Sequence, residues 1–299
     1  MNSHKMQGHL NESLAEEHHC YIFAFQCPDR LGVLAQVSNF FYQYGAFIKE
    51  TASYNDPQSE RFFYRCVFDD RLLSVPMEQF AAELEKLAVE LNMDYQLRDL
   101  EHKPRVLVAV SKYNHCLNAL LGKWKSGVLP VEIVAVVSNH PDCQSITEWY
   151  GLPYHHFPIT AATKPAQESK ILALIDKERI DLLVLARYMQ VLSDGMCQQL
   201  EGRAINIHHS FLPGFKGARP YHQAYERGVK VIGATAHYVN RDLDEGPIIV
   251  QEVKPIDHKA GADEMVNMGH DIEATALTQA VRLHVELRVQ LNGQRTVIL

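Results

Sequence analysis

Two side chains near the middle of the C-terminal half have the types and spacing needed to act on a carbonyl group. Asn206 and His208 lie two residues apart in the otherwise apolar run Ala204-Ile-Asn-Ile-His. In a strand, this spacing places both side chains on the same face. An amide can stabilise an oxyanion, and an imidazole can transfer protons near neutral pH. A pair that only hydrogen-bonds loop backbone fits these two residues equally well.

A third group with chemical potential, Asp244, lies in the polar turn Arg241-Asp-Leu-Asp-Glu-Gly-Pro247 between two predicted strands. The Gly-Pro pair favours a sharp turn that gives the carboxylate a defined direction. A carboxylate beside His208 would raise the pKa of the imidazole or orient a water molecule. A solvated acidic turn is the other interpretation of this segment.

The elements that must position these groups alternate between strands and helices along residues 105–299. Apolar runs such as VLVAV and LLVLA are typical of strands buried on both faces of a parallel sheet. The alternation predicts a doubly wound, mostly parallel α/β sheet, which binds ligands beyond the carboxyl ends of its strands. The predicted strands are 106–110, 132–138, 182–186, 204–208, 231–239 and 248–250, and the predicted helices are 117–125, 167–177 and 271–291.

Residues 20–97 have the pattern of a second, smaller α/β domain. The spacing of apolar residues predicts the order β-α-β-β-α-β, which is the ferredoxin-like arrangement. The charged stretch 98–104 is predicted to be a linker, and the polar residues 1–19 a flexible tail. The predicted strands are 21–26, 46–54, 62–68 and 95–97, and the predicted helices are 31–44 and 77–91.

Composition narrows the class of protein. The chain has 299 residues and a formal net charge of −7, which disfavours binding to a phosphate backbone, so no nucleic-acid partner is expected. No apolar run reaches the roughly 20 residues of a membrane span, and residues 1–19 lack the apolar core of a signal peptide, so a cytoplasmic protein without a membrane partner is expected. Six scattered cysteines and the absence of a CxxC or HExxH motif support neither a disulfide framework nor a metal site.

The motif Asn206-Ile-His208-x-Ser210-x-Leu-Pro-x-x-x-Gly217, followed by His237-Tyr-Val and Asp244-x-Gly246-Pro, resembles the folate-dependent formyltransferase family. The resemblance covers roughly residues 105–260. In that family an Asn, a His and an Asp act on the formyl group of 10-formyltetrahydrofolate. By motif position, the resemblance assigns these catalytic roles to Asn206, His208 and Asp244.

The N-terminal unit resembles an ACT domain, with Cys27-Pro28-Asp29-Arg30-x-Gly32 opening its first helix. ACT domains bind amino acids or pair with one another, so the resemblance implies either an amino-acid effector at the start of helix 31–44 or a structural pairing module. A homo-oligomer is expected. An ACT domain ahead of a formyltransferase-like domain resembles the formyltetrahydrofolate deformylases, which are hydrolases of purine and one-carbon metabolism.

The turn after the first strand of the larger domain favours hydrolysis over transfer. Transferases to glycinamide ribonucleotide hold a phosphate in a Gly-rich turn, but residues 106–121 contain no glycine. The sequence Ser111-Lys-Tyr-Asn-His-Cys-Leu117 itself resembles the deformylase branch. A transferase to a small acceptor and a folate-binding ACT-type sensor without catalysis are the alternatives. A tRNA formyltransferase is disfavoured because it usually has a further C-terminal domain.

The resemblance also implies supporting roles. A water oriented by Asp244 would attack the formyl carbon, with the oxyanion held by Asn206 and protonated His208. No cofactor or metal is expected, since the folate is the substrate. His209 is expected to be a packing or loop residue. The expected folate-binding residues, whose apolar members are also compatible with plain core packing, are Met189, Gln190, Val191, Leu192, Val239, Asn240 and Asp242. Residues expected to support the catalytic groups are Ser210, His237 and Gly246.

Overall fold

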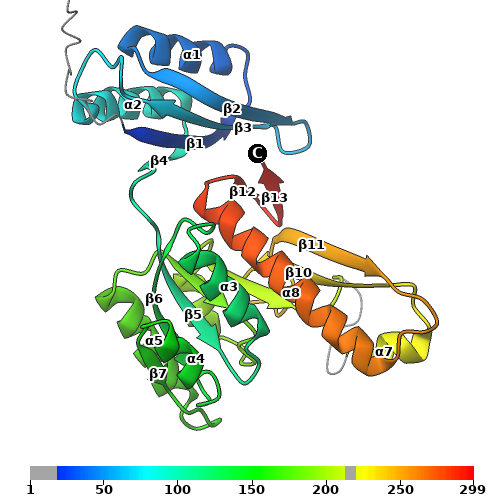
Figure 1. The fold of residues 1–299 in the computed structure, drawn as a ribbon. Helices are drawn as coiled ribbons and strands as arrows, with labels where there is room; N and C mark the ends of the chain where they lie inside the picture. The colour runs from blue at the N-terminus through cyan, green and yellow to red at the C-terminus, as the bar shows by residue number, and fades with distance from the viewer. Residues whose placement is uncertain (1–18, 213–219) are drawn as a thin grey trace, which may run out of the picture.

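The computed structural model describes residues 19–212 and 220–299, which form two α/β units joined by a short connection (Figure 1). The predicted tail 1–19, except for its last residue, lies outside the described residues. The motif positions Pro213 and Gly217 lie outside them as well. Within the described ranges, no helix is long and apolar enough to cross a membrane.

The N-terminal unit contains a four-stranded antiparallel sheet in the order β2-β3-β1-β4, and the β-α-β-β-α-β order predicted from the sequence is present. One face of the sheet packs against both helices through an aromatic cluster that includes Phe23, Phe41 and Phe80. The last two residues of β4 fall within the segment predicted to be a linker. The elements are β1 (Cys20–Pro28), α1 (Val33–Tyr44), β2 (Phe47–Asp56), β3 (Arg61–Asp69), α2 (Met77–Leu91) and β4 (Asp94–Asp99).

The larger unit is built on a seven-stranded sheet in the order β11-β10-β9-β8-β5-β6-β7. Strands β9, β8, β5, β6 and β7 are parallel to one another, whereas β10 is antiparallel to both β9 and β11. The chain starts in the middle at β5, builds one side and then returns to build the other, as predicted for a doubly wound sheet. The strands are β5 (Arg105–Val110), β6 (Glu132–Ser138), β7 (Tyr154–His156), β8 (Leu182–Leu185), β9 (Ala204–His208), β10 (Val231–Tyr238) and β11 (Ile248–Pro255).

Helices cover both faces of this sheet. Alternate residues of β5 and β8 point to opposite sides and divide the core into two clusters, one against α3 and α8 and one against α5 and α6. This double burial explains the continuous apolar runs in the sequence. The helices are α3 (His115–Lys125), α4 (Gln144–Trp149), α5 (Lys164–Lys177), α6 (Asp194–Gln199), α7 (Pro220–Arg227) and α8 (Ala262–Val285).

The C-terminal segment differs from its prediction. The helix predicted at 271–291 begins nine residues earlier and ends at Val285, and Leu287 has a positive φ of 52° that breaks the helix. The apolar residues 289 and 291 alternate as in a strand and belong to a hairpin of β12 (Val289–Asn292) and β13 (Arg295–Ile298). The short elements α4, β7, α6 and α7 were not predicted either, because so few residues show no clear period.

The hairpin β12–β13 connects the two units and lies between the N-terminal sheet and α8 (Figure 1). Arg65 of β3 donates a hydrogen bond of 2.8 Å to the carbonyl of Glu286, and Gln290 donates one of 3.0 Å to the carbonyl of Tyr64. Asp56 accepts a hydrogen bond from Asn292. The N-terminal unit is therefore bound to the end of α8 and is not merely tethered by its linker.

Candidate active site

Strand pairing brings the first polar side chains together. Asn206 lies in β9 opposite His237 in the antiparallel neighbour β10, and His208 lies opposite Thr235. The Asn206 amide nitrogen is 3.3 Å from Nε2 of His237. Nδ1 of His237 is 2.9 Å from the carbonyl oxygen of Tyr238, and because a carbonyl only accepts, Nδ1 carries the proton. Nε2 is then free to accept a hydrogen bond from Asn206, which fixes the orientation of the amide.

Asp244 reaches the same place from the turn after β10. Its Oδ2 is 3.2 Å from Nδ1 of His208, and its Oδ1 is 3.7 Å from Nε2 of His237. Burial alone would raise the pKa of the Asp244 carboxyl, but the hydrogen bond from His208 and the charge of that ring outweigh it and hold this pKa well below its usual range. The group is therefore a carboxylate at neutral pH.

The turn holds Asp244 in a strained conformation. Its backbone φ is 57°, in the left-handed region that a residue with a Cβ rarely adopts. Gly246 lies so close to β10 that a Cβ atom there would come within 1.7 Å of the Tyr238 carbonyl oxygen. The Tyr238 amide also donates a 2.9 Å hydrogen bond to the Pro247 carbonyl. A residue without a side chain at 246 is therefore required for the turn to lie against the strand.

His208 contributes the imidazole of the site. Its side chain is only 6% exposed and its Nδ1 faces Asp244. The other ring nitrogen, Nε2, is buried and has no hydrogen-bond partner within residues 19–212 and 220–299. A buried polar atom without a partner is costly, and this one lies in a residue that lines a cavity, where a bound substrate would complete its hydrogen bonding.

The loop after His208 is anchored by a residue that the sequence analysis did not select. The Thr235 hydroxyl donates a 2.9 Å hydrogen bond to the carbonyl of Ser210 and accepts one of 3.1 Å from the amide of Leu212. Ser210 was expected to support the catalytic groups, and its carbonyl takes part in this contact. Thr235 lies opposite His208 in the sheet. The signal available in the sequence was a polar residue inside an otherwise apolar strand.

A cavity of about 270 Å³ opens beside these groups, at the carboxyl ends of β8 and β9. Its walls include all seven residues predicted to bind folate: Met189, Gln190, Val191, Leu192, Val239, Asn240 and Asp242. Asn206, His208, His237 and Asp244 line the same cavity. The structure therefore brings the predicted catalytic and binding residues to one place.

The segment after β8 has the chemistry needed to bind a flat heterocycle. Met189 and Val191 are about half exposed, which leaves apolar surface at the cavity. Within the described chain, no backbone amide or carbonyl of residues 190–192 forms a hydrogen bond. Free backbone donors and acceptors beside apolar side chains can bind the polar edge and the face of a ring at the same time.

Two further residues at the cavity were missed or interpreted differently. Arg187 follows β8 directly and was not selected, although a charged residue at the carboxyl end of a buried strand is a signal in such a sheet. His209 was expected to be a packing or loop residue. In the structure His209 lines the cavity, and its ring stacks against that of His208 with the ring centroids 5.1 Å apart.

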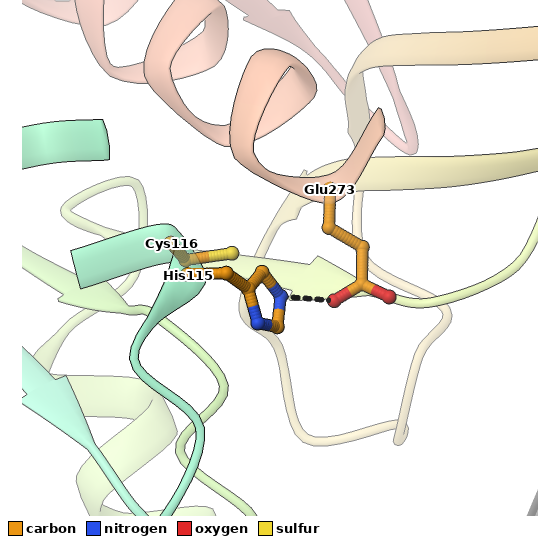
Figure 2. Close-up of side chains that lie close together, drawn as sticks. All are labelled: His115, Cys116 and Glu273. Carbon is orange, nitrogen blue, oxygen red and sulfur yellow. Dashed lines mark hydrogen bonds and ion pairs between the residues drawn. The ribbon is translucent and has the colours of Figure 1, made fainter. Parts of the chain in front are cut away.

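A cluster of metal-ligating residue types lies on the α3–α8 side of the sheet, where His115 points toward the Glu273 carboxylate beside Cys116 (Figure 2). Oε2 of Glu273 is already 2.8 Å from Nε2 of His115 and 3.3 Å from Nε of Arg187. Burial raises the pKa of the Cys116 thiol well above its usual value. The Glu273 carboxylate already faces a cationic side chain, the Arg187 guanidinium.

Comparison with known proteins first defines the class. Residues 104–281 match the family described as Formyl transferase. The crystal structure of glycinamide ribonucleotide transformylase 1 from Symbiobacterium toebii is 30% identical and superposes with a TM-score of 0.62, covering 66% of this chain and 95% of that one. The larger unit therefore has the formyl transferase fold, on a mostly parallel sheet.

Relatives that extend over both units define the family more closely. Formyltetrahydrofolate deformylase from Corynebacterium sp. (strain P-1) is 49% identical over 279 residues, which are 93% of this chain and 98% of that protein. The crystal structure of formyltetrahydrofolate deformylase from Burkholderia mallei ATCC 23344 is 46% identical, with a TM-score of 0.90, and covers 94% of this chain and 99% of that one. The chain belongs to the formyltetrahydrofolate deformylase family.

Proposed function

We propose that this chain hydrolyses 10-formyltetrahydrofolate to formate and tetrahydrofolate, with Asn206, His208 and Asp244 as its catalytic residues. The observation that carries the assignment is that an amide, an imidazole and a carboxylate from separate segments meet at one cavity, with Nε2 of His208 unpaired among the described residues. These are the groups needed to hold an oxyanion, transfer a proton and orient a water.

The reaction consists of an addition and an elimination. Water, oriented by Asp244, adds its oxygen to the formyl carbon and gives one proton to the Asp244 carboxylate, from which that proton later reaches N10. The carbonyl oxygen becomes an oxyanion that accepts hydrogen bonds from Asn206 and from protonated His208. The bond between carbon and N10 then breaks as N10 receives a proton, and formate and tetrahydrofolate leave. The three side chains supply every proton donor and acceptor that these steps need, so we propose that no cofactor takes part.

The turn after β5 supports water as the nucleophile. Bulky rings lie at the start of α3, where a phosphate-binding turn would present bare backbone. The rings of His115 and His270 stack with centroids 4.0 Å apart, and the Tyr113 ring lies 5.9 Å from that of His270. The Arg187 guanidinium lies 5.3 Å from the Tyr113 ring. A phosphorylated acceptor would have to displace these side chains, whereas water would not.

Incubation of the chain with 10-formyltetrahydrofolate alone tests the function. Without any acceptor, equal amounts of formate and tetrahydrofolate are expected. Formate release that does not depend on a formyl acceptor such as glycinamide ribonucleotide would fit hydrolysis. No turnover until an acceptor is added would indicate a transferase. Folate binding without turnover under both conditions would indicate a sensor.

We propose that the folate ring binds along the segment after β8 and the turn after β10. The support is the placement of the seven predicted folate-binding residues around the cavity and the unpaired backbone of residues 190–192. His237 would support the site by fixing the Asn206 amide as well as facing Asp244. Gly246 would support it by permitting the close turn.

We propose that the N-terminal unit is an ACT domain with an amino-acid effector. Its sheet order fits, and α1 begins after Gly32 without a side-chain cap, which leaves amide groups for a carboxylate. A change in turnover on adding single amino acids is expected, and no change with any of them would remove the effector. A structural pairing role would then be the remaining interpretation.

We further propose a cytoplasmic homo-oligomer with a role in balancing one-carbon pools for purine synthesis. Strand β2 is at an edge of the N-terminal sheet and is largely exposed, so it is available to pair with a second copy. All six cysteines are free thiols, which fits a reducing compartment. Light scattering of the purified chain tests the assembly, and a monomer at every concentration would contradict it.

A further inference from the structure

Arg187 is held in an unusual position at the edge of the active-site cavity. It follows β8, is only 8% exposed and has a backbone φ of 65°. Such a conformation costs free energy for a residue with a Cβ and persists only where the surroundings fix it. Its guanidinium must therefore have strong partners on the protein side.

The first partner is Glu273 of α8, the carboxylate shown in Figure 2. Its side chain is fully buried, its Oε2 is near His115 and Nε of Arg187, and its Oε1 accepts a 2.9 Å hydrogen bond from the Tyr221 hydroxyl. Burial raises the pKa of Glu273, but hydrogen bonds from His115 and Tyr221 and the charge of Arg187 outweigh it and lower this pKa. Both of its oxygens are therefore committed.

The second partner is His209, which lines the cavity. Nη1 of Arg187 contacts Nδ1 of His209. A guanidinium only donates hydrogen bonds, so Nδ1 is an acceptor and the ring proton is on Nε2. No residue in the described part of the chain forms a hydrogen bond with Nε2 of His209, which leaves this N–H available to a molecule in the cavity.

The surroundings also keep His209 uncharged. Burial, followed by the charge of Arg187, lowers the pKa of His209 to about 4. The ionisable groups that face this ring come from five segments of the chain. They are Arg187 after β8, His208 of β9, Tyr221 of α7, Asp244 after β10 and Glu273 of α8. Burial and the charge of Arg187 together outweigh the two carboxylates, Asp244 and Glu273, which act in the opposite direction.

We propose that His209 is a further catalytic residue, a neutral imidazole that donates a hydrogen bond from Nε2 to the formyl oxygen, and that Arg187 and Glu273 are positioning residues that fix its tautomer. The inference rests on the proposed hydrolysis. It assigns opposite states to two neighbouring histidines, with His208 able to carry a proton to the substrate and His209 only able to donate a hydrogen bond.

Nuclear magnetic resonance of ¹⁵N-histidine-labelled wild-type chain tests the tautomer without any assay of activity. At pH 7 the His209 ring should be neutral, with the proton on Nε2, and an Arg187→Lys variant, which retains a positive donor, should preserve this state. An imidazolium, or a ring with its proton on Nδ1, would overturn the proposal. The His209 signal is assigned by its loss in His209→Gln.

Kinetics test the donor. His209→Ala should lower kcat about 10²-fold, the usual loss for one oxyanion donor, whereas His209→Gln, whose amide nitrogen lies near the position of Nε2, should remain within about tenfold of wild type by the same reasoning. Equal losses in both variants would overturn the role. If the wild type itself does not hydrolyse the folate, the proposed function fails instead, so the two failures are distinguishable.

The pH profile tests the positioning pair. Replacing Arg187 by Met removes a positive charge and the donor, so the pKa of His209 rises and kcat should begin to fall at a higher pH than in wild type. Arg203→Met, at the opposite end of β9, is the matched control and should leave the profile unchanged. A profile for Arg187→Met that superposes on wild type would overturn the positioning role, and if that variant does not fold, the resonance measurement on wild type still decides.

Discussion

Two carboxylates flank the adjacent histidines of this site, and their environments differ. Asp244 lies on a strained turn at the cavity, 16% exposed, and faces His208 and His237. Glu273 lies in the middle of α8, fully buried, with both oxygens bound by protein groups. A carboxylate that orients a water molecule needs an oxygen that faces the cavity. A carboxylate that holds other side chains in position needs both of its oxygens paired with protein groups. Asp244 therefore fits a chemical role and Glu273 a positional one.

The comparison implies that substitutions at the two carboxylates separate activity from stability. Asp244→Asn should lower turnover about 10³- to 10⁴-fold, because a neutral amide cannot take a proton from the attacking water or stabilise a protonated His208. Folding should be retained, since Asn tolerates a positive φ. Stopped assays of formate release measure the loss. Asp263→Asn, exposed in the first turn of α8 and away from the cavity, is the control and should change turnover less than tenfold. A modest loss in Asp244→Asn would break the distinction.

Glu273→Gln should lower the free energy of unfolding, in contrast to Asp244→Asn, which should retain its fold. Loss of the buried charge leaves Arg187 without its counter-ion, and breaking one partner of a buried pair costs about 3–5 kcal/mol. Urea unfolding followed by circular dichroism measures the change. Glu264→Gln, exposed in the first turn of the same helix, should change stability by less than about 1 kcal/mol. Equal stability of Glu273→Gln and wild type would contradict the positional role.

Asn206→Ala sharpens the chemical side of the comparison. Removing an oxyanion donor should lower turnover about 10²- to 10³-fold, with an unfolding midpoint close to that of wild type, because Asn206 is not part of the sealed core. The measurement is kcat at saturating folate. Near-normal turnover would show that the oxyanion is held elsewhere.

The smallest expected effect is the dependence of stability on pH. His209 and His284 both have pKa values lowered to about 4, mainly by burial. Their neutral forms stabilise the fold fully above the unfolded value of about 6.5, and this contribution is lost as the pH falls toward 4. The loss is at most about 3 kcal/mol for each histidine, at 1.36 kcal/mol per unit. Urea titrations between pH 7 and 4.5 should give a shallower slope for His284→Asn than for wild type, and an unchanged slope would contradict this assignment.

The sequence predicts those helices and strands whose apolar residues repeat with a clear period, and those site residues that belong to a recognisable motif. Strands such as 132–138 and 204–208 match the structure at both ends, because their apolar runs are bounded by turn residues. It could not find α8 in full, since Gly261 and the acidic first turn gave a start signal without an apolar stripe.

The same limit explains what was missed in the site. Asn206, His208 and Asp244 belong to motifs, but Arg187, His209 and Glu273 are brought together only by the packing of α8 on the sheet. Residues 187 and 273 are far apart in the chain, and nothing local in either segment indicates the contact. Such ion pairs depend on tertiary structure, and single-sequence patterns do not contain that information.

A structure of the chain with a non-hydrolysable analogue of 10-formyltetrahydrofolate tests the central assignment most directly. The carbon that corresponds to the formyl group should lie in the cavity, with its oxygen within hydrogen-bond reach of the Asn206 amide and Nε2 of His208, about 3 Å. A water held by Asp244 should lie about 3–3.5 Å from that carbon. An analogue bound with this carbon away from all three side chains would contradict the assignment.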